Sequence, residues 1–232
     1  SVCARFIDSV LAGLAEFSLV YVDDVVIFSR TFEEHLEHLR AVLTRFKEAG
    51  LYVNLLKSSF AQPRIQFLGH VIDADGRRAD PDKVKAMLEL PQPDSFKSLR
   101  SWLCLGGYCS PDIKNFMSIT APLQRFKASN STAAADFVAK WTPECAAAVE
   151  QLRKAFTELP VLRLPDFNRS FVLVCDASRV GLGASLMQPY EKDGQMVYLP
   201  VAYRSRLLEQ RRSGWAPFHL EWLAFCDALK HW

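Results

Sequence analysis

Residues 17–28 read FSLVYVDDVVIF, and this stretch decides the fold of the N-terminal part of the chain. Two apolar runs meet at Asp23 and Asp24, a pattern that predicts a β-hairpin with both carboxylates at its tip. The tip lacks the Asn-Gly or Asp-Gly pair that a relaxed two-residue hairpin prefers. Strong strands must therefore hold an unfavourable turn, and such a conflict between local preference and fold is expected at a functional site.

The paired acids of this hairpin favour a metal site. Adjacent carboxylates repel each other, and a divalent cation relieves the repulsion. Mg²⁺ commonly binds one or two protein carboxylates, with substrate phosphates completing the shell. Two such ions about 4 Å apart can activate an attacking oxygen and stabilise a leaving one. The alternative is an exposed turn whose acids face water, but the hydrophobic strands on both sides favour Asp23 and Asp24 as metal ligands.

A second acid follows an apolar run near the C-terminal end. Residues 171–175 read FVLVC, which predicts a strand covered on both faces, with Asp176 at its end. Further strands are expected over 181–187, where two glycines allow close approach, and from 196 to about 203.

A helix over 217–232 is expected to carry a third candidate acid. Its large apolar residues form one stripe, so we expect a mostly buried helix. The stripe consists of Phe218, Trp222, Phe225, Leu229 and Trp232, and it is widened by Leu220, Leu223, Ala224 and Ala228. Glu221 lies among these residues, where an unpaired acid would be costly. A metal shared with Asp176 would explain it, and an ion pair with Arg204 or another base is the alternative.

The remaining elements are predicted from caps, turns and periodicity. Thr31 and Glu34 form a capping box that opens a helix ending at Gly50. Thr142 and Pro143 begin another helix, which runs to about residue 158. The other expected elements are a strand over 51–55, a strand over 65–72 with Gly69 as a bulge, a turn at 75–76, and helices near 82–89 and 95–105.

Length, composition and charge restrict the classes of protein to which this chain can belong. The 232 residues allow one or two domains; 50% are hydrophobic and 23% charged, as in a soluble globular protein. No apolar stretch approaches the ~20 residues that span a bilayer, and no targeting signal is visible. The net charge of +2 does not by itself indicate nucleic-acid binding. Residues 57–127, however, hold 11 basic and 7 acidic side chains, and such a segment could contact a phosphate backbone. The six cysteines form no CxxC pair, so reduced thiols are expected.

An ordered series of motifs resembles one family over essentially the whole chain. Tyr21-Val22-Asp23-Asp24 resembles the polymerase active-site motif of reverse transcriptases. The series as a whole resembles the Pol polyprotein of gypsy-type LTR retrotransposons. Its later members are FLGHVI at 67–72, APL at 121–123, LPDF at 164–167 and CDAS at 175–178.

The resemblance implies an α+β chain with four parts. Residues 1–80 would be part of a reverse-transcriptase palm, and residues 81–127 a thumb-like helical region. Residues 128–136 would be a linker, because they are small and polar, and residues 137–232 part of an RNase H-like domain. One departure lies at 102–111, where WLCLGGYCSP lacks the paired tyrosines and basic residues that the family shows. This departure weakens the expectation of a template–primer grip.

The resemblance also implies residue roles for the polymerase reaction. Asp23 would be the principal ligand of Mg²⁺ or Mn²⁺, and Asp24 would assist it. Tyr21 and Val22 would line the nucleotide site, and Phe67-Leu68-Gly69 would support the primer end. The partners would be an RNA or DNA template–primer and deoxynucleoside triphosphates.

For the second reaction, Asp176 and Glu221 would hold the ions that activate water against the RNA strand of an RNA–DNA hybrid. The rest of the Pol polyprotein would be a further partner, and no membrane is expected. The location would be cytoplasmic, in a virus-like particle, or nuclear. We expect the 232-residue chain alone to be inactive, because the family takes further acids from segments outside it.

Two other interpretations stay open. One is a catalytically dead relic or a co-opted nucleic-acid-binding or interaction module. An unrelated metal-dependent phosphotransferase would explain the hairpin but not the second pair of acids.

Overall fold

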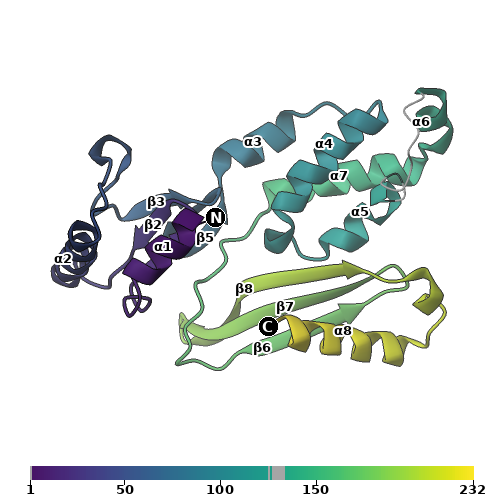
Figure 1. Cartoon of the computed structure of the whole chain (residues 1–232). Coiled ribbons are helices and arrows are strands. Elements are labelled where there is room, and N and C mark those ends of the chain that lie inside the picture. The colour runs from purple at the N-terminus through teal and green to yellow at the C-terminus, as the bar shows by residue number, and fades with distance from the viewer. Residues whose placement is uncertain (1, 125, 127–133) are drawn as a thin grey trace. The chain divides into compact units, whose positions relative to one another are not determined.

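The computed structural model describes residues 2–124, 126 and 134–232 (Figure 1). The chain divides into two compact units, one ending at Pro63 and the other starting at Arg64. Helices and antiparallel strands are mixed in both, which confirms the predicted α+β class.

The first unit is built from two helices and one hairpin. Its elements are α1 (Val2–Val10), β1 (Ser18–Tyr21), β2 (Asp24–Ile27), α2 (Phe32–Glu48) and the short 3₁₀ helix η1 (Leu55–Lys57). Ile7, Leu11 and Val42 are buried between them, and apolar residues of both strands pack against this small core. The hairpin is therefore anchored to this core through both of its strands.

Local signals set the bounds of α2 as predicted. The Thr31 hydroxyl accepts the Glu34 backbone N–H at 3.2 Å. The Glu34 carboxylate accepts the backbone N–H of Arg30 at 2.6 Å, one residue before the N-cap. Gly50 follows the helix with φ +69°, the left-handed conformation that commonly ends a helix.

The strand predicted over 51–55 is wrong. Leu51 packs on the core of the first unit, but the following residues have no strand partner and lead into η1. An apolar run becomes a strand only where a neighbouring strand accepts its backbone hydrogen bonds.

The second unit begins with a three-stranded antiparallel sheet. Its strands are β3 (Arg64–Phe67), β4 (His70–Asp73) and β5 (Gly76–Ala79). The single strand predicted over 65–72, with Gly69 as a bulge, is wrong. Leu68 and Gly69 both have positive φ, +47° and +67°, and form the turn of a hairpin. A turn over residues 73–76 is confirmed, but Ala74 and Asp75 form its tip, because Gly76 is the first residue of β5 and pairs with Asp73.

Helices form the middle of the second unit. They are α3 (Pro81–Glu89), α4 (Phe96–Tyr108), the 3₁₀ helix η2 (Ser110–Asp112), α5 (Phe116–Gln124), α6 (Ala134–Lys140) and α7 (Pro143–Thr157). Their shared core includes Met87, Leu99, Trp102, Phe116, Leu152 and Phe156. Most of the predicted linker, 128–133, lies outside the described residues, whereas 134–136 form the first turn of α6.

A second antiparallel sheet ends the chain, in the order β6 (Val172–Ala177), β7 (Gly181–Lys192) and β8 (Gln195–Leu207). The 3₁₀ helix η3 (Gln210–Arg212) and α8 (Pro217–His231) follow, and α8 runs along β6 and β7 (Figure 1). On the other face, the Met117 N–H of α5 donates to Ser205 Oγ of β8 at 3.1 Å. The sheet thus lies between α8 and α5.

Two burial predictions for this sheet are wrong. β6 is an edge strand with Val174 exposed, so it is not covered on both faces. In α8 the buried residues are Leu220, Ala224 and Ala228, while Phe218 and Trp222 are exposed. The buried face of α8 therefore consists of one leucine and two alanines, and the aromatic stripe lies partly in solvent.

No helix in the described part of the chain combines the length and apolarity needed to cross a bilayer. The five cysteines whose side chains are described are free thiols, as predicted: Cys104, Cys109, Cys145, Cys175 and Cys226.

Candidate functional site

The tip of the first hairpin brings the predicted polymerase residues together. Tyr21 pairs with Asp24 across the hairpin, and Val22 and Asp23 form the connection. Val22 has φ +57°, which is unusual for a β-branched residue. Such a conformation costs about 1–3 kcal/mol and persists only where the flanking structure imposes it. The prediction of an unfavourable turn held by its strands is therefore confirmed.

The base of the same hairpin is fixed by a contact that the sequence analysis missed. Phe28 donates its N–H to the Phe17 carbonyl at 3.0 Å. The His38 ring of α2 stacks on Phe17 with centroids 3.7 Å apart. Ser29 Oγ lies 2.7 Å from His38 Nδ1 and 3.1 Å from His35 Nδ1. The hairpin is clamped to α2 at its base, whereas its acidic tip is exposed.

Asp23 and Asp24 are exposed, and neither has an ion pair or a side-chain hydrogen bond among the described residues. Two free, adjacent carboxylates are a donor set that fits a hard divalent cation. Within residues 2–124, 126 and 134–232, no group of three or more His, Cys, Asp or Glu side chains is placed to hold a metal ion. The remaining ligands of an ion at this tip would have to be water, phosphate oxygens or further protein groups.

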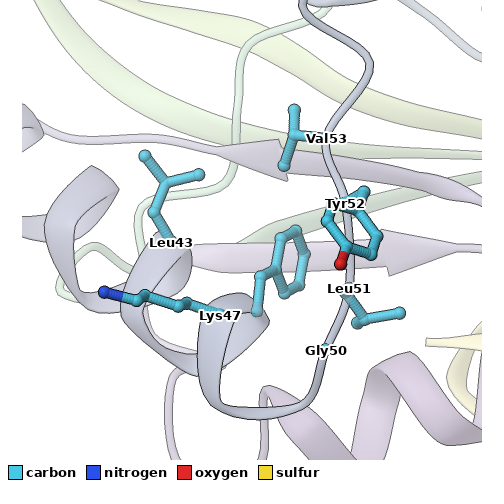
Figure 2. Close-up of a pocket in the computed structure, with 7 residues that line it drawn as sticks. Leu43, Lys47, Gly50, Leu51, Tyr52 and Val53 are labelled. Atoms are coloured by element: carbon cyan, nitrogen blue, oxygen red, sulfur yellow. The ribbon is translucent and has the colours of Figure 1, made fainter.

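An open pocket of about 270 Å³ lies elsewhere in the first unit (Figure 2). It is lined by Leu43, Phe46, Lys47, Gly50, Leu51, Tyr52 and Val53. The lining is mostly apolar, includes one cation and contains neither hairpin aspartate. This pocket is therefore not the metal site.

The predicted primer-supporting residues form the β3–β4 turn. Tyr108, at the end of α4, donates its hydroxyl to the Leu68 carbonyl. A Cβ on Gly69 would collide with that hydroxyl, so glycine permits both the left-handed backbone and the close approach. The turn is thus held against the end of α4.

A buried acid anchors the strand that follows the turn. Asp112 is 1% exposed, and its carboxylate lies 3.1 Å from His70 Nε2 and 2.9 Å from Arg77 Nη2. His70 Nδ1 lies 3.0 Å from the Leu68 carbonyl oxygen. The sequence analysis missed Asp112, because its partners lie 42 and 35 residues away.

Asp176 lies on β6 opposite Gly183 of β7. Gly183 faces α5, because a Cβ there would collide with Asn115 Oδ1. Directly paired residues of an antiparallel sheet point to one face, so the Asp176 side chain is on the α5 face. It is exposed and has no ion pair in the described part of the chain.

Glu221 lies on α8, which covers the opposite face of the sheet. It is exposed and unpaired among the described residues, so the expected apolar surroundings are wrong. Its proposed alternative partner Arg204 binds Asp227 instead, at 2.6 Å, and Arg206 binds the same carboxylate at 2.8 Å. Burial raises the pKa of Asp227, but the two guanidinium groups outweigh burial and lower it. The binding of one shared metal ion by Asp176 and Glu221 stays a prediction.

Comparisons with known proteins agree on two regions. Residues 1–72 match the family described as reverse transcriptase (RNA-dependent DNA polymerase). Residues 141–232 match the RNase H-like domain found in reverse transcriptase. Both families are generally dependent on divalent metal ions.

Relatives cover the whole chain. The Transposon Tf2-3 and Tf2-7 polyproteins of Schizosaccharomyces pombe are 32% identical to it over 228 residues, 98% of this chain. The chain spans only 16% of the length of these polyproteins.

Solved structures give the same result. A foamy viral protease-reverse transcriptase in complex with double-stranded DNA is similar with a TM-score of 0.81 and 25% identity, over 98% of this chain and 38% of that one. The complex of such an enzyme with an RNA/DNA hybrid has a TM-score of 0.78 and 25% identity, over 98% and 30% of the two chains. This chain therefore contains a reverse-transcriptase region and an RNase H-like region, and it corresponds to a fragment of a retrotransposon Pol polyprotein.

Proposed function

We propose that the protein serves RNA-directed DNA synthesis and the hydrolysis of RNA in RNA–DNA hybrids, as part of a longer Pol polyprotein. Its substrates would be a template–primer, deoxynucleoside triphosphates and the hybrid product. The observation that carries the proposal is the exposed pair of free carboxylates on a clamped hairpin. The nucleic acids in the two foamy viral complexes support the choice of partners.

In the polymerase reaction, Asp23 and Asp24 would hold Mg²⁺ or Mn²⁺. The ion supplies activation of the attacking hydroxyl and stabilisation of the leaving phosphate oxygen. The exposed side chains of Tyr21 and Val22 would line the nucleotide site. The Phe67-Leu68-Gly69 turn would support the primer end, because Tyr108 fixes its backbone.

In the hydrolytic reaction, Asp176 and Glu221 would contribute carboxylates to the RNase H-like site. Both are exposed and free, in contrast to Asp227, which two arginines occupy. We place the protein in the cytoplasm, in a virus-like particle, or in the nucleus.

The metal proposal is tested by iron-mediated cleavage. Fe²⁺ with ascorbate and peroxide cuts a backbone near a bound ion, and the fragments are mapped by mass spectrometry. We expect cuts next to Asp23 that excess Mg²⁺ suppresses and that Asp23→Asn removes. Glu48→Gln is the control, because Glu48 is an exposed acid at the end of α2. Unchanged cutting in Asp23→Asn would refute the assignment.

A noncatalytic nucleic-acid-binding module is the second candidate. Cys109-Ser110-Pro111 stand where the resemblance expects tyrosine and basic residues, and this departure favours a chain that has lost its polymerase activity. Salt-dependent binding of a hybrid by the full Pol polyprotein, without primer extension or RNA cleavage, would favour this candidate over the enzyme.

A further inference from the structure

Lys83 of α3 lies beside the β3–β4 turn. A Cβ on Gly69 would be 2.8 Å from Lys83 Cε, so the lysine stem passes directly over the turn. The ammonium group lies 4.9 Å from the centroid of the Tyr108 ring. The lysine is thus oriented by a cation–π contact with the residue that holds the Leu68 carbonyl.

The acids around this lysine are occupied by other groups. Asp112 is bound by His70 and Arg77. The Asp80 carboxylate accepts the Asp82 N–H and so caps the first turn of α3. Lys83 itself has no ion pair in the described part of the chain. The Lys83 ammonium therefore lies beside the β3–β4 turn without an ion-pair partner among the described residues, because the neighbouring carboxylates bind other groups.

The surface around the ammonium suits a nucleic-acid strand. Leu68 is 43% exposed and Tyr108 is 38% exposed. They present apolar and aromatic area next to one positive charge, as a sugar–phosphate backbone requires. Burial, together with the nearby Cys109 and Asp112, raises the pKa of Tyr108. Its hydroxyl stays protonated and keeps donating to the turn.

We propose that the Lys83 ammonium binds a phosphate of the nucleic-acid strand that lies over the Leu68-Gly69 turn. Tyr108 is a positioning residue, since it orients both the lysine and the turn. The inference rests on the proposed function, because it takes a nucleic-acid strand as the ligand of this turn.

The test is the salt dependence of binding. Fluorescence anisotropy measures binding of the 232-residue chain to a labelled 20-base-pair DNA with a recessed 3′ end, from 50 to 200 mM KCl. Each phosphate contact contributes about 0.9 to the slope of log affinity against log salt. Removing one contact with Lys83→Gln should therefore make the affinity loss about 3.5-fold larger at 50 mM than at 200 mM salt. Lys83→Arg should restore the slope.

Lys85→Gln is the matched control on the same helix. Lys85 pairs with Glu89 at 3.8 Å, and its side chain is 74% exposed. It carries the same charge change, and its slope should equal that of the unmodified chain. Thermal unfolding of each variant shows that the fold is kept.

The outcomes separate the two proposals. Equal slopes for Lys83→Gln and the unmodified chain would overturn the role of Lys83 while leaving nucleic-acid binding intact. If Lys83→Gln and Lys85→Gln lower the slope of log affinity against log salt equally, the effect comes from net charge alone. That result would also overturn the role of Lys83. No binding by the unmodified chain at 50 mM would overturn the role of Lys83 in this chain, whereas the function proposed for the longer polyprotein is tested separately by the iron-mediated cleavage at Asp23.

Discussion

Replacing Asp112 with alanine should destabilise the second unit strongly. The change leaves His70 and Arg77 without the carboxylate that both contact. Removing one partner of a buried ion pair costs about 3–5 kcal/mol. The side chains of His70 and Arg77 are 13% and 30% exposed, so water can reach both. The expected loss is therefore at the lower end, about 3 kcal/mol.

The assay is urea and thermal unfolding followed by tryptophan fluorescence. All five tryptophans, at positions 102, 141, 215, 222 and 232, belong to the second unit, so the signal reports on that unit alone. For a unit of this size each kcal/mol shifts Tm by about 2–4 °C, which predicts a drop of about 6–12 °C.

Asp75→Ala is the control for this prediction. Asp75 is an 80% exposed acid that lies 3.9 Å from Arg78 of the same hairpin. Its loss should cost less than about 0.5 kcal/mol, because exposed ion pairs contribute little. A loss below about 1 kcal/mol for Asp112→Ala, in a chain that still unfolds cooperatively, would refute the role of Asp112 as the anchor of β4 and β5.

Two further predictions concern the second unit. The pKa of Asp227 is lowered in the fold, so its contribution to stability is present above the unfolded pKa and is lost as pH falls through the folded pKa. Asp227→Asn should therefore flatten the fall in unfolding free energy that is measured between about pH 5 and pH 2. An unchanged fall over this pH range would contradict the role of the Arg204 contact. Gly69→Ala should cost about 1–3 kcal/mol in urea unfolding, because it combines a left-handed backbone with a collision at Tyr108. Gly107→Ala in α4 is the control, and it should have the opposite effect. An added Cβ at Gly107 meets nothing within 4 Å, so alanine should stabilise the helix by up to about 1 kcal/mol. Equal changes in unfolding free energy for the two variants would contradict the role of the Gly69 conformation and of its contact with Tyr108.

Local patterns in the sequence predicted much of the fold correctly. The hairpin at 18–27, the N-caps Thr31 and Thr142, and Gly50 after α2 all lie where the residues indicated. These features depend on neighbouring residues, since alternation sets the faces of a strand and a cap needs only atoms within one helical turn.

Other predictions failed where one apolar run allowed two packings. The run at 65–72 reads as one strand, but Leu68 and Gly69 reverse the chain, because β4 pairs with both β3 and β5 and Tyr108 holds the Leu68 carbonyl. In α8 the sequence shows which residues are apolar, but not which face meets the sheet.

The sequence by itself predicted four candidate acids: Asp23, Asp24 and Asp176 from their motifs, and Glu221 from its place on a predicted helix. Only the tertiary structure decided which carboxylates are already occupied. Asp112 and Asp227 are bound by basic residues more than 20 positions away, whereas the four candidate acids are free within the described residues. The reason is that a carboxylate is neutralised by whatever cation the fold brings within about 4 Å, and sequence distance does not limit that contact.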